Sequence, residues 1–280
     1  MNTLSRDRQA AIVRALVEGN SLRATARLTG TSQNTVTKLL RDLGAHRKNH
    51  HDRFVRGVKA KRVQCDEIWA FCGATEEQKA DGWGDVWTWT ALDQDSKLIV
   101  SYRVGDRDAP TAHEFAEDLA DRLANRVQLT TDGLRLYLSA VEDAFGWARV
   151  DFAQLVKLYG PGPDLEATRR YSPAVCIGAD KIAIMGNPKL EDVSTSHVER
   201  SNLTMRMQMR RFTRLTNAFS KKMENHLYAV ALHFMYYNFC RSHSTLAKAR
   251  GGMHTTPAMA AGLADRVWTV EDLLTLLRGD

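Results

Sequence analysis

VQCDEIWAFC occupies residues 63–72, and it is followed by DVWTWTALDQ at 85–94 and KLIVSYRVGD at 97–106. Turn-rich segments separate these three stretches. Within DVWTWTALDQ, tryptophan and threonine alternate, as they do in a half-buried β-strand. We therefore expect three consecutive strands here.

Helical and extended patterns alternate after these strands. Asp108-Ala109-Pro110 begins a helix that we expect to reach about Asn125. The next elements, in order, are a strand in VQLTTD (127–132), a helix in LRLYLSAVEDAFG (134–146) and a strand, favoured over a helix, in VDFAQLVKLYG (150–160). This succession is typical of the ribonuclease-H-like fold. We predict an α/β chain whose ribonuclease-H-like core contains a mixed five-stranded sheet with helices.

Three short helices are expected in the first 45 residues, at 6–18, 22–28 and 32–43. A tight turn, Thr29-Gly30-Thr31, separates the second from the third, which is the helix-turn-helix pattern. We therefore predict a small N-terminal all-α helix-turn-helix domain. A three-helix bundle without DNA contact is the alternative. The polar face of the third helix carries side chains of the types that read base edges and phosphates, namely Gln33, Asn34, Thr37, Lys38 and Arg41.

Basic residues are unevenly distributed along the chain, whose net charge is +6. Residues 1–62 contain 14 Lys or Arg against 4 acids, whereas the remainder contains 25 against 29. The segment 200–222 contains seven basic residues and no acid. Two basic segments around a slightly acidic middle favour a polyanionic partner and an acid-lined site, with solvated surface as the alternative.

The composition argues against several classes of protein. The four cysteines lie far apart and form no CxxC pair, which argues against a disulfide framework and against a zinc ribbon. No apolar run approaches the length of a membrane span, and the N-terminus lacks the apolar region of a secretory signal. We expect a cytoplasmic protein with no membrane partner.

These patterns divide the chain into four parts. GPGPDL (160–165) is typical of a loop, and AVCIGADKIAIMGNP (174–188) of a β-hairpin with its turn at Gly-Ala-Asp. We place the helix-turn-helix domain at 1–45, a basic linker at 46–62, the ribonuclease-H-like domain at 63–245 with an insertion at about 160–192, and a C-terminal tail at 246–280.

Three acids on separate elements are candidates for a metal-dependent phosphoryl-transfer site. Asp66 lies on the first strand, Asp132 ends the fourth, and Glu199 begins the helix in HVERSN. Because the first and fourth strands are neighbours in a ribonuclease-H-like sheet, the aspartates would lie side by side, with Glu199 brought across them. Such acids can hold two Mg²⁺ ions, for which Mn²⁺ can substitute, about 3.5–4 Å apart. Asp66 would bridge both ions, and Asp132 and Glu199 would each complete one.

Each of these acids also has a structural interpretation. The alternation of apolar residues does not choose between Asp66 and Glu67, which point to opposite faces of the strand. Asp132 precedes a glycine and could be a turn residue. Glu199 ends the pattern SHVE, a capping box in which it would only cap the helix. Glu191 is a weaker candidate for the third acid.

Four blocks of sequence, in order, resemble transposases of the insertion-sequence-one family, which belongs to the DDE superfamily: VQCDEIWAF, TTDGLRLY, HVERSNLTMR and NAFSKKMENH. The resemblance covers about residues 60–235. It implies a ribonuclease-H-like core, a divalent metal, and Asp66, Asp132 and Glu199 as the catalytic and metal-binding triad. It also matches Arg206 to the arginine of the family's glutamate helix.

Two arginines near the proposed third acid are candidates for DNA contact. Arg206 lies seven residues after Glu199, on the same helical face, and could contact a phosphate near the metals. Arg210 is a weaker candidate. YYNFCRSHSTL (236–246) resembles a segment that follows the glutamate helix in several transposases and integrases, although a capped helix end explains the same residues.

The chain departs from the family pattern in two ways. It lacks the cysteine zinc motif that usually precedes the family's helix-turn-helix. In addition, 66 residues separate Asp132 from Glu199, where the usual interval is short. The expected insertion at about 160–192 accounts for much of this excess, and it makes the pairing of Glu199 with the aspartates the weaker part of the assignment.

The resemblance implies a DDE transposase of a bacterial insertion sequence, associated with the nucleoid, that cleaves DNA ends and transfers the strands. Its partner would be double-stranded DNA, both terminal inverted repeats and target. A homodimer or higher oligomer is expected in the DNA complex, because two ends are brought together. The alternatives are a ribonuclease-H-like nuclease without joining activity and a helix-turn-helix regulator.

Overall fold

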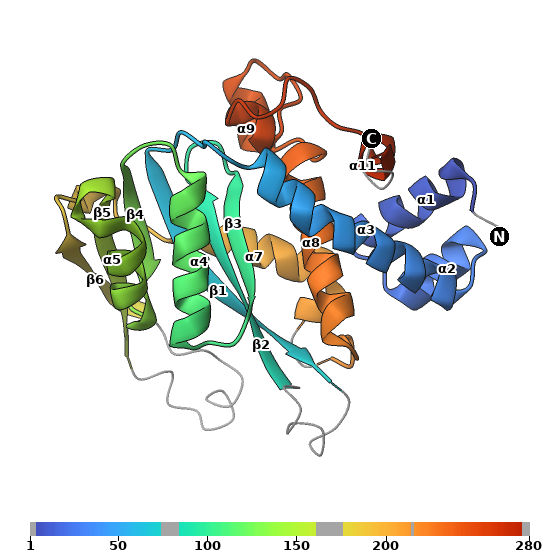
Figure 1. The fold of residues 1–280 in the computed structure, drawn as a ribbon, viewed down its shortest axis with the longest axis horizontal. Helices are drawn as coiled ribbons and strands as arrows, with labels where there is room; N and C mark the ends of the chain where they lie inside the picture. Colours follow the sequence, from blue (N-terminus) through green and yellow to red (C-terminus); the bar gives the residue numbers. More distant parts are fainter. Residues whose placement is uncertain (1–3, 74–83, 161–175, 214–215, 276–280) are drawn as a thin grey trace.

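The computed structural model describes residues 4–73, 84–160, 176–213 and 216–275 (Figure 1). It is a mixed α/β fold in which one six-stranded sheet has the strand order β3-β2-β1-β4-β5-β6. The strands are β1 (Arg62–Cys72), β2 (Gly84–Asp93), β3 (Ile99–Gly105), β4 (Val127–Asp132), β5 (Val150–Tyr159) and β6 (Cys176–Met185).

Helices surround this sheet and form a separate group at one end of the molecule (Figure 1). The α-helices are α1 (Arg6–Val17), α2 (Leu22–Thr29), α3 (Gln33–Phe54), α4 (Ala109–Arg122), α5 (Leu136–Arg149), α7 (Ser196–Gln208), α8 (Met223–Phe239), α9 (Ser244–Ala249), α10 (Pro257–Ala260) and α11 (Val270–Thr275). Two 3₁₀-helices are η2 (Leu190–Asp192) and η3 (Arg210–Phe212). In the described residues, no helix is both long enough and apolar enough to cross a membrane.

The first five strands follow one another along the chain as expected, and the one predicted pairing, of the first strand with the fourth, is present. β1 pairs antiparallel with β2, and β2 with β3, whereas β4 is parallel to both β1 and β5. The first and fourth strands are therefore neighbours. Their pairing covers only residues 62–64 and 128–130, so the two strands part just before Asp66. This divergence creates the position at which the acidic side chains meet.

The sixth strand corrects two predictions, the five-stranded sheet and the hairpin at 174–188. Residues 176–185 form a single strand, β6, which runs antiparallel to β5. The Gly-Ala-Asp sequence does not turn, because β5 extends to Tyr159 and offers a backbone partner along the whole segment: Asp180 lies opposite Val156. The predicted loop GPGPDL lies, apart from its first residue, outside the described residues.

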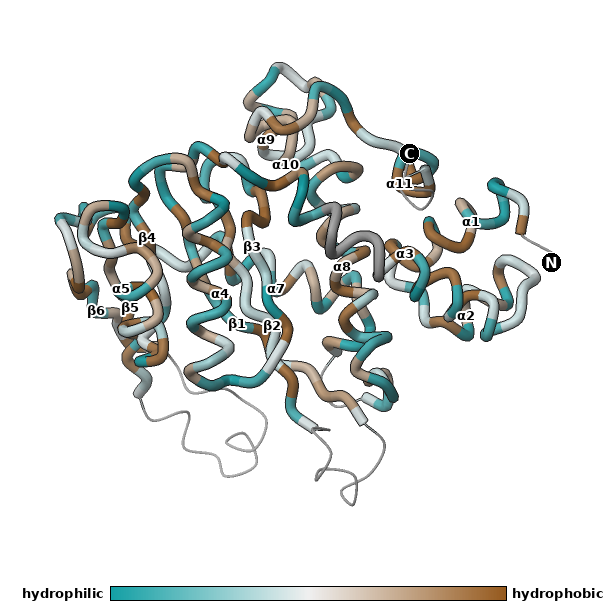
Figure 2. Tube along the Cα trace, in the orientation of Figure 1, coloured by the Kyte–Doolittle hydropathy of each residue, from teal (hydrophilic) through white to brown (hydrophobic). Residues whose placement is uncertain are grey.

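Two hydrophobic clusters cover the two faces of the sheet. Side chains alternate along β1, so Val63 and Cys65 pack with α4 and α5, whereas Ile68 and Ala70 pack with α7, α8 and the N-terminal helices. Figure 2 shows hydrophobic and hydrophilic residues alternating around the helices that pack on the sheet. The second cluster continues from the sheet into α1, α2 and α3, so the N-terminal helices share a core with the rest of the fold.

The N-terminal helices begin where the sequence predicts. The hydroxyls of Ser21 and Ser32 accept hydrogen bonds from the backbone N–H groups of Ala24 and Thr35, which caps α2 and α3. Gly30, between these helices, has the left-handed conformation of a helix end (φ 61°).

The third helix is longer than predicted. α3 was expected to end at residue 43, but it continues to Phe54, through the first part of the expected linker. Gly44 directly follows the expected end, and a glycine at that position is typical of a helix C-terminus. In the structure it is instead the point where α3 meets α8, because a Cβ at Gly44 would lie 2.1 Å from Cβ of Tyr228.

A buried arginine ties α4 to α3. Arg122 is 2% exposed; its Nε donates to Asp118 (2.6 Å) and its Nη1 donates to the carbonyl of Val55 (3.1 Å). It also forms an ion pair with Asp52. The network satisfies a desolvated guanidinium and fixes the end of α3 against the sheet.

Replacing Arg122 by methionine should destabilise the protein by about 3 kcal/mol, the lower end of the range for a broken buried pair, because both carboxylates are partly exposed. Urea unfolding measures the change. Arg126→Met is the matched control, since Arg126 pairs with Asp151 at the surface and should cost about 1 kcal/mol or less. Equal losses in the two variants would contradict the structural role of Arg122.

Candidate active site

Three carboxylates meet where β1 and β4 separate. Asp66 and Glu67 are consecutive on β1, and Asp132 is the last residue of β4. One carboxylate oxygen of each lies within 4.8 Å of the others. This arrangement brings together the two aspartates proposed from the sequence and adds Glu67. We refer to Asp66, Glu67 and Asp132 as the acidic cluster.

Asp66 faces α7. Nδ2 of Asn202 donates to its Oδ2 (2.7 Å), and the backbone N–H of Glu67 donates to its Oδ1 (2.9 Å). Burial is the main cause that raises the pKa of Asp66 to about 7, and the negative charges of Glu67, Asp132 and Glu199 contribute to the rise. The protein therefore holds this carboxylate in a position where its negative charge is poorly compensated.

Glu67 is oriented from the opposite side of the sheet. Arg107 donates to its Oε1 from Nε (2.9 Å) and from Nη2 (2.6 Å), and the hydroxyl of Tyr137 donates to its Oε2 (3.1 Å). Burial and the charge of Asp132 raise the pKa of Glu67, while Arg107 lowers it. Glu67 is therefore paired with a cation, and it still lies beside the two aspartates.

Asp132 closes the cluster at the end of β4. Its Oδ1 accepts a hydrogen bond from the backbone N–H of Leu134 (3.0 Å), so it also stabilises the turn that follows the strand. Burial raises its pKa. Asp132 therefore does both: it stabilises the turn after β4, and its carboxylate lies beside that of Asp66.

Glu199 lies in the first turn of α7, outside the acidic cluster but close to it. Its Oε1 accepts hydrogen bonds from Nζ of Lys157 (2.6 Å), on β5, and from the hydroxyl of Thr195. Its charge contributes to the raised pKa values of both Asp66 and Asp132. The fold therefore brings all three acids of the proposed triad into one region, with Lys157 bound to the third.

The start of α7 is capped by Gln64 rather than by Glu199. Oε1 of Gln64, a buried side chain on β1, accepts from the backbone N–H groups of His197 (2.9 Å) and Val198 (3.1 Å). The SHVE pattern therefore does not form a capping box, and the carboxylate of Glu199 is used elsewhere. Because Gln64 lies two residues before Asp66, the same strand fixes the helix that carries Glu199.

The donor set fits a hard divalent cation. Carboxylate oxygens are the ligands that Mg²⁺ and Mn²⁺ prefer. Among the described residues, neither Asp66 nor Asp132 forms an ion pair. Oδ1 of Asn202, whose Nδ2 binds Asp66, is buried and has no hydrogen-bond partner in the described part of the chain. A cation beside the aspartates would offset charges that the protein compensates only in part.

The side chains predicted to read DNA lie on α3, where Gln33, Asn34, Lys38 and Arg41 are exposed and Thr37 is half-buried. Two of them have acidic neighbours. Lys38 pairs with Asp42 (2.7 Å), and Arg41 lies 3.7 Å from Glu224 of α8. These surface pairs are weak and leave both cations accessible.

The two arginines predicted to contact DNA follow Glu199 along the chain. Arg206 is half-buried in the last turn of α7, and Arg210 is exposed in η3. Asn238, from YYNFCRSHSTL, is fully buried and bonds the backbone of Ile99 with both ends of its amide, so it attaches α8 to β3. The burial of Asn238 agrees with the interpretation of YYNFCRSHSTL as a helix end.

Several residues of the site carried no individual signal in the sequence. Arg107 and Tyr137 lie far from Glu67 along the chain, and Lys157 is one lysine among many. Only the presence of Glu67 directly beside Asp66 indicated a further acid. Contacts between distant segments, rather than any motif, identify these positions.

Comparisons with known proteins identify no family for this chain. No family model matches it, and no curated protein matches it in sequence. Among solved structures, it is similar to the piggyBac transposase in a synaptic complex with hairpin DNA, at 9% identity and a TM-score of 0.48, over 100% of this chain and 73% of that one. A pre-cleavage Mos1 transpososome matches at 11% identity and a TM-score of 0.24, over 83% and 78%. The functional proposal below is therefore based on the acidic cluster and its surroundings.

Proposed function

We propose that this chain is a DDE-type transposase with a ribonuclease-H-like core, of the insertion-sequence-one type. It would use a divalent metal to cleave the DNA ends of its element and to join them to target DNA. The observation that carries the proposal is the acidic cluster, with Asp66 on a central strand and Asp132 at the end of its parallel neighbour. Close to this cluster, Glu199 lies on a helix that is capped by the same central strand.

The chemistry of phosphoryl transfer accounts for this arrangement. A pair of divalent cations, when bound, activates the attacking hydroxyl and stabilises the leaving oxygen. Asp66 and Asp132 would hold such ions, with Glu199 as the third ligand. Burying several carboxylates together is unfavourable without a cation, and the pKa of Asp66 is accordingly raised, first by burial and then by the neighbouring negative charges.

Lys157 and Arg107 have separate roles in this proposal. Arg107 keeps Glu67 paired and thereby orients the β1 side of the site. Lys157, whose side chain is one-third exposed, pairs with Glu199. A phosphate of bound DNA would compete for its ammonium group and leave the carboxylate of Glu199 available for a metal.

DNA binding is proposed for the N-terminal helices and for the basic residues after Glu199. The exposed side of α3 carries Gln33, Asn34, Lys38 and Arg41, with Thr37 at its edge, which suits a recognition helix. Arg206 and Arg210 continue from α7 towards these helices. The net positive charge of residues 1–62 supports a polyanionic partner.

Asp66→Asn should stabilise the metal-free protein and remove its response to metal. The pKa of Asp66 is raised to about 7 from 3.8, so in EDTA its ionisation costs the wild type stability as the pH rises from about 4 through 7, and the stability of Asp66→Asn relative to the wild type should increase over this range. At pH 8, saturating Mg²⁺ or Mn²⁺ should raise the wild-type Tm by roughly 5–10 °C and that of Asp66→Asn very little.

Thermal unfolding with and without metal tests this expectation. Asp121→Asn, an exposed acid on α4, is the matched control and should behave like the wild type. A metal response that persists in Asp66→Asn would argue against a cation at the acidic cluster.

Asp66→Asn, Asp132→Asn and Glu199→Gln should each reduce cleavage and joining by at least about 100-fold, because each removes a proposed metal ligand. The assay uses labelled duplexes that carry the DNA flanking the coding sequence, with Mg²⁺ or Mn²⁺, and separates nicked from joined products. Glu191→Gln, an exposed acid in η2, is the control and should keep activity.

Each other outcome of that assay has a definite meaning. Loss of activity in Glu191→Gln but not in Glu199→Gln would identify Glu191 as the third acid. Cleavage without joined products would favour the nuclease. Binding of the duplex without any cleavage by the wild type would favour the regulator.

A further inference from the structure

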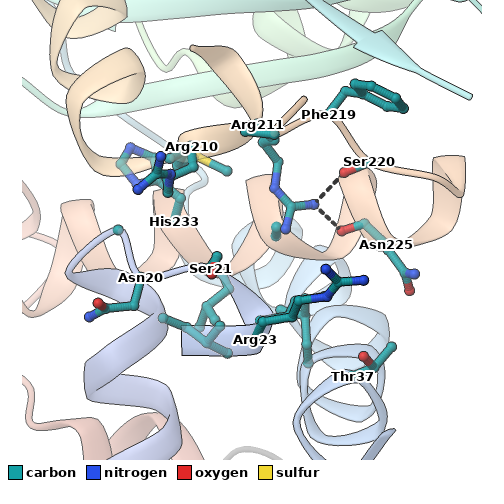
Figure 3. A pocket seen from close by; sticks show the side chains of 18 of the residues that line it. Asn20, Ser21, Arg23, Thr37, Arg210, Arg211, Phe219, Ser220, Asn225 and His233 are labelled. Carbon is teal, nitrogen blue, oxygen red and sulfur yellow. Dashed lines mark hydrogen bonds between the residues drawn. The ribbon is translucent and has the colours of Figure 1, made fainter. Parts of the chain in front are cut away.

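A cavity of about 570 Å³ lies between the N-terminal helices and the end of α7, away from the acidic cluster (Figure 3). Its walls come from the turn between α1 and α2, the start of α3, the segments 208–211 and 217–222, and one side of α8. Each of these elements contributes polar as well as apolar side chains, so the cavity is a joint of mixed character between two parts of the molecule.

The charge of this cavity is positive and uncompensated. Among its described lining residues there is no aspartate or glutamate. Such a lining attracts anions and repels cations. Five cationic side chains line it: Arg23, Arg210, Arg211, Lys221 and Lys222.

Arg211 is the cavity residue best suited to bind an anion. Its Nη1 donates to Oγ of Ser220 (2.8 Å) and to the carbonyl oxygen of Asn225 (2.6 Å), both neutral acceptors (Figure 3). Burial lowers its pKa to about 10, and no carboxylate of the described chain pairs with it. A guanidinium has five N–H donors in a planar fork that matches the oxygens of a phosphate group.

Neutral groups around Arg211 suit the same ligand. Asn20 and Ser21 lie in the wall formed by the N-terminal helices, where Arg23 is also exposed (Figure 3). Phe219 lies on the opposite wall and offers an apolar surface. Phosphate recognition in nucleic-acid complexes commonly combines basic side chains with such hydroxyl and amide donors.

The cavity is connected to the acidic cluster through α7. Gly19, in the turn between α1 and α2, packs against the last residue of α7: a Cβ there would lie 2.9 Å from the carbonyl oxygen of Gln208. Glu199 is nine residues earlier on the same helix, which corresponds to a rise of about 14 Å. On duplex DNA, that distance spans about four base-pair steps along one strand.

We propose that this cavity binds a backbone phosphate of the DNA, within about four base pairs of the phosphate that is cut. The inference rests on the proposed function and deepens it, because it assigns a phosphate to the joint between the N-terminal helices and α7. A bound phosphate neutralises Arg211 and bridges it to Arg23 and Lys222. The strand that enters the acidic cluster is thereby held in register with the DNA contacted by the N-terminal helices.

The test measures affinity for a duplex carrying the flanking DNA, in EDTA, so that it does not depend on cleavage. Single methylphosphonate substitutions remove the charge of one phosphate at a time. For the wild type, one or two adjacent positions within about four base pairs of the cut should each cost about tenfold in affinity. This loss should disappear in the double variant Arg23→Gln/Lys222→Gln, which avoids the buried Arg211.

Arg27→Gln is the matched control, since Arg27 is exposed on α2 and does not line the cavity. It should keep the full methylphosphonate effect, as should Asp66→Asn. An identical effect in the double variant and in the wild type would overturn the proposal, even if the protein cuts DNA. If the protein cuts no DNA but shows the methylphosphonate effect, and the double variant loses that effect, phosphate binding in the cavity is supported. Only the proposed enzymatic activity is then refuted.

Free phosphate compounds carry the same chemical group as the DNA backbone and are the alternative ligands of the cavity. Inorganic phosphate and pyrophosphate are therefore tested for thermal stabilisation of the wild type and the double variant. Stabilisation by pyrophosphate that depends on Arg23 and Lys222, without any position-specific methylphosphonate effect, would overturn the assignment to DNA. Weak stabilisation by free phosphate, together with the position-specific effect, would support it.

Discussion

The arrangement of this protein depends on the electrostatic cost of holding several carboxylates at the junction of two neighbouring strands. Asp66, Glu67 and Asp132 lie within 4.8 Å of one another, and burial raises the pKa of each. The surrounding groups reduce this cost without removing it. Arg107 and Tyr137 bond to Glu67, and further along, Lys157 bonds to Glu199, while the two aspartates keep neutral partners. The charge left over would favour a bound cation, as the proposed function requires.

The central strand β1 organises both the core and the site. Its alternating side chains divide the interior into two hydrophobic clusters, one under α4 and α5 and the other under α7 and α8. The same alternation sends Asp66 towards α7 and Glu67 towards Arg107 and Tyr137. Because β1 separates from β4 just before these residues, both carboxylates still reach Asp132. Gln64, on the same strand, caps α7 and sets the position of Glu199.

Two close approaches connect the N-terminal helices to this framework. Gly44 allows α3 to pack directly on α8, and Gly19 brings the α1–α2 turn against the end of α7. The N-terminal helices therefore share the second hydrophobic cluster with the sheet, and α3 extends past the expected boundary of its domain. Under the proposed function, a short, well-packed connection of this kind would couple the position of DNA on the N-terminal helices to the helix that carries Glu199. The basic cavity lies at this same joint.

Local patterns were sufficient for the order of the first five strands along the chain and for the caps of α2 and α3, which depend on side-chain periodicity and on residues a few positions apart. Asp66, Asp132 and Glu199 were nominated from the expected order of elements and from the family resemblance, because periodicity did not choose between Asp66 and Glu67. Tertiary structure decided the partners of the acids, the single strand β6, the extension of α3 and the cavity around Arg211. Each depends on contacts between residues distant in sequence: Lys157 is 42 residues from Glu199, and Tyr137 is 70 from Glu67. Periodicity indicates which face a side chain occupies, but only the packed chain determines what it faces.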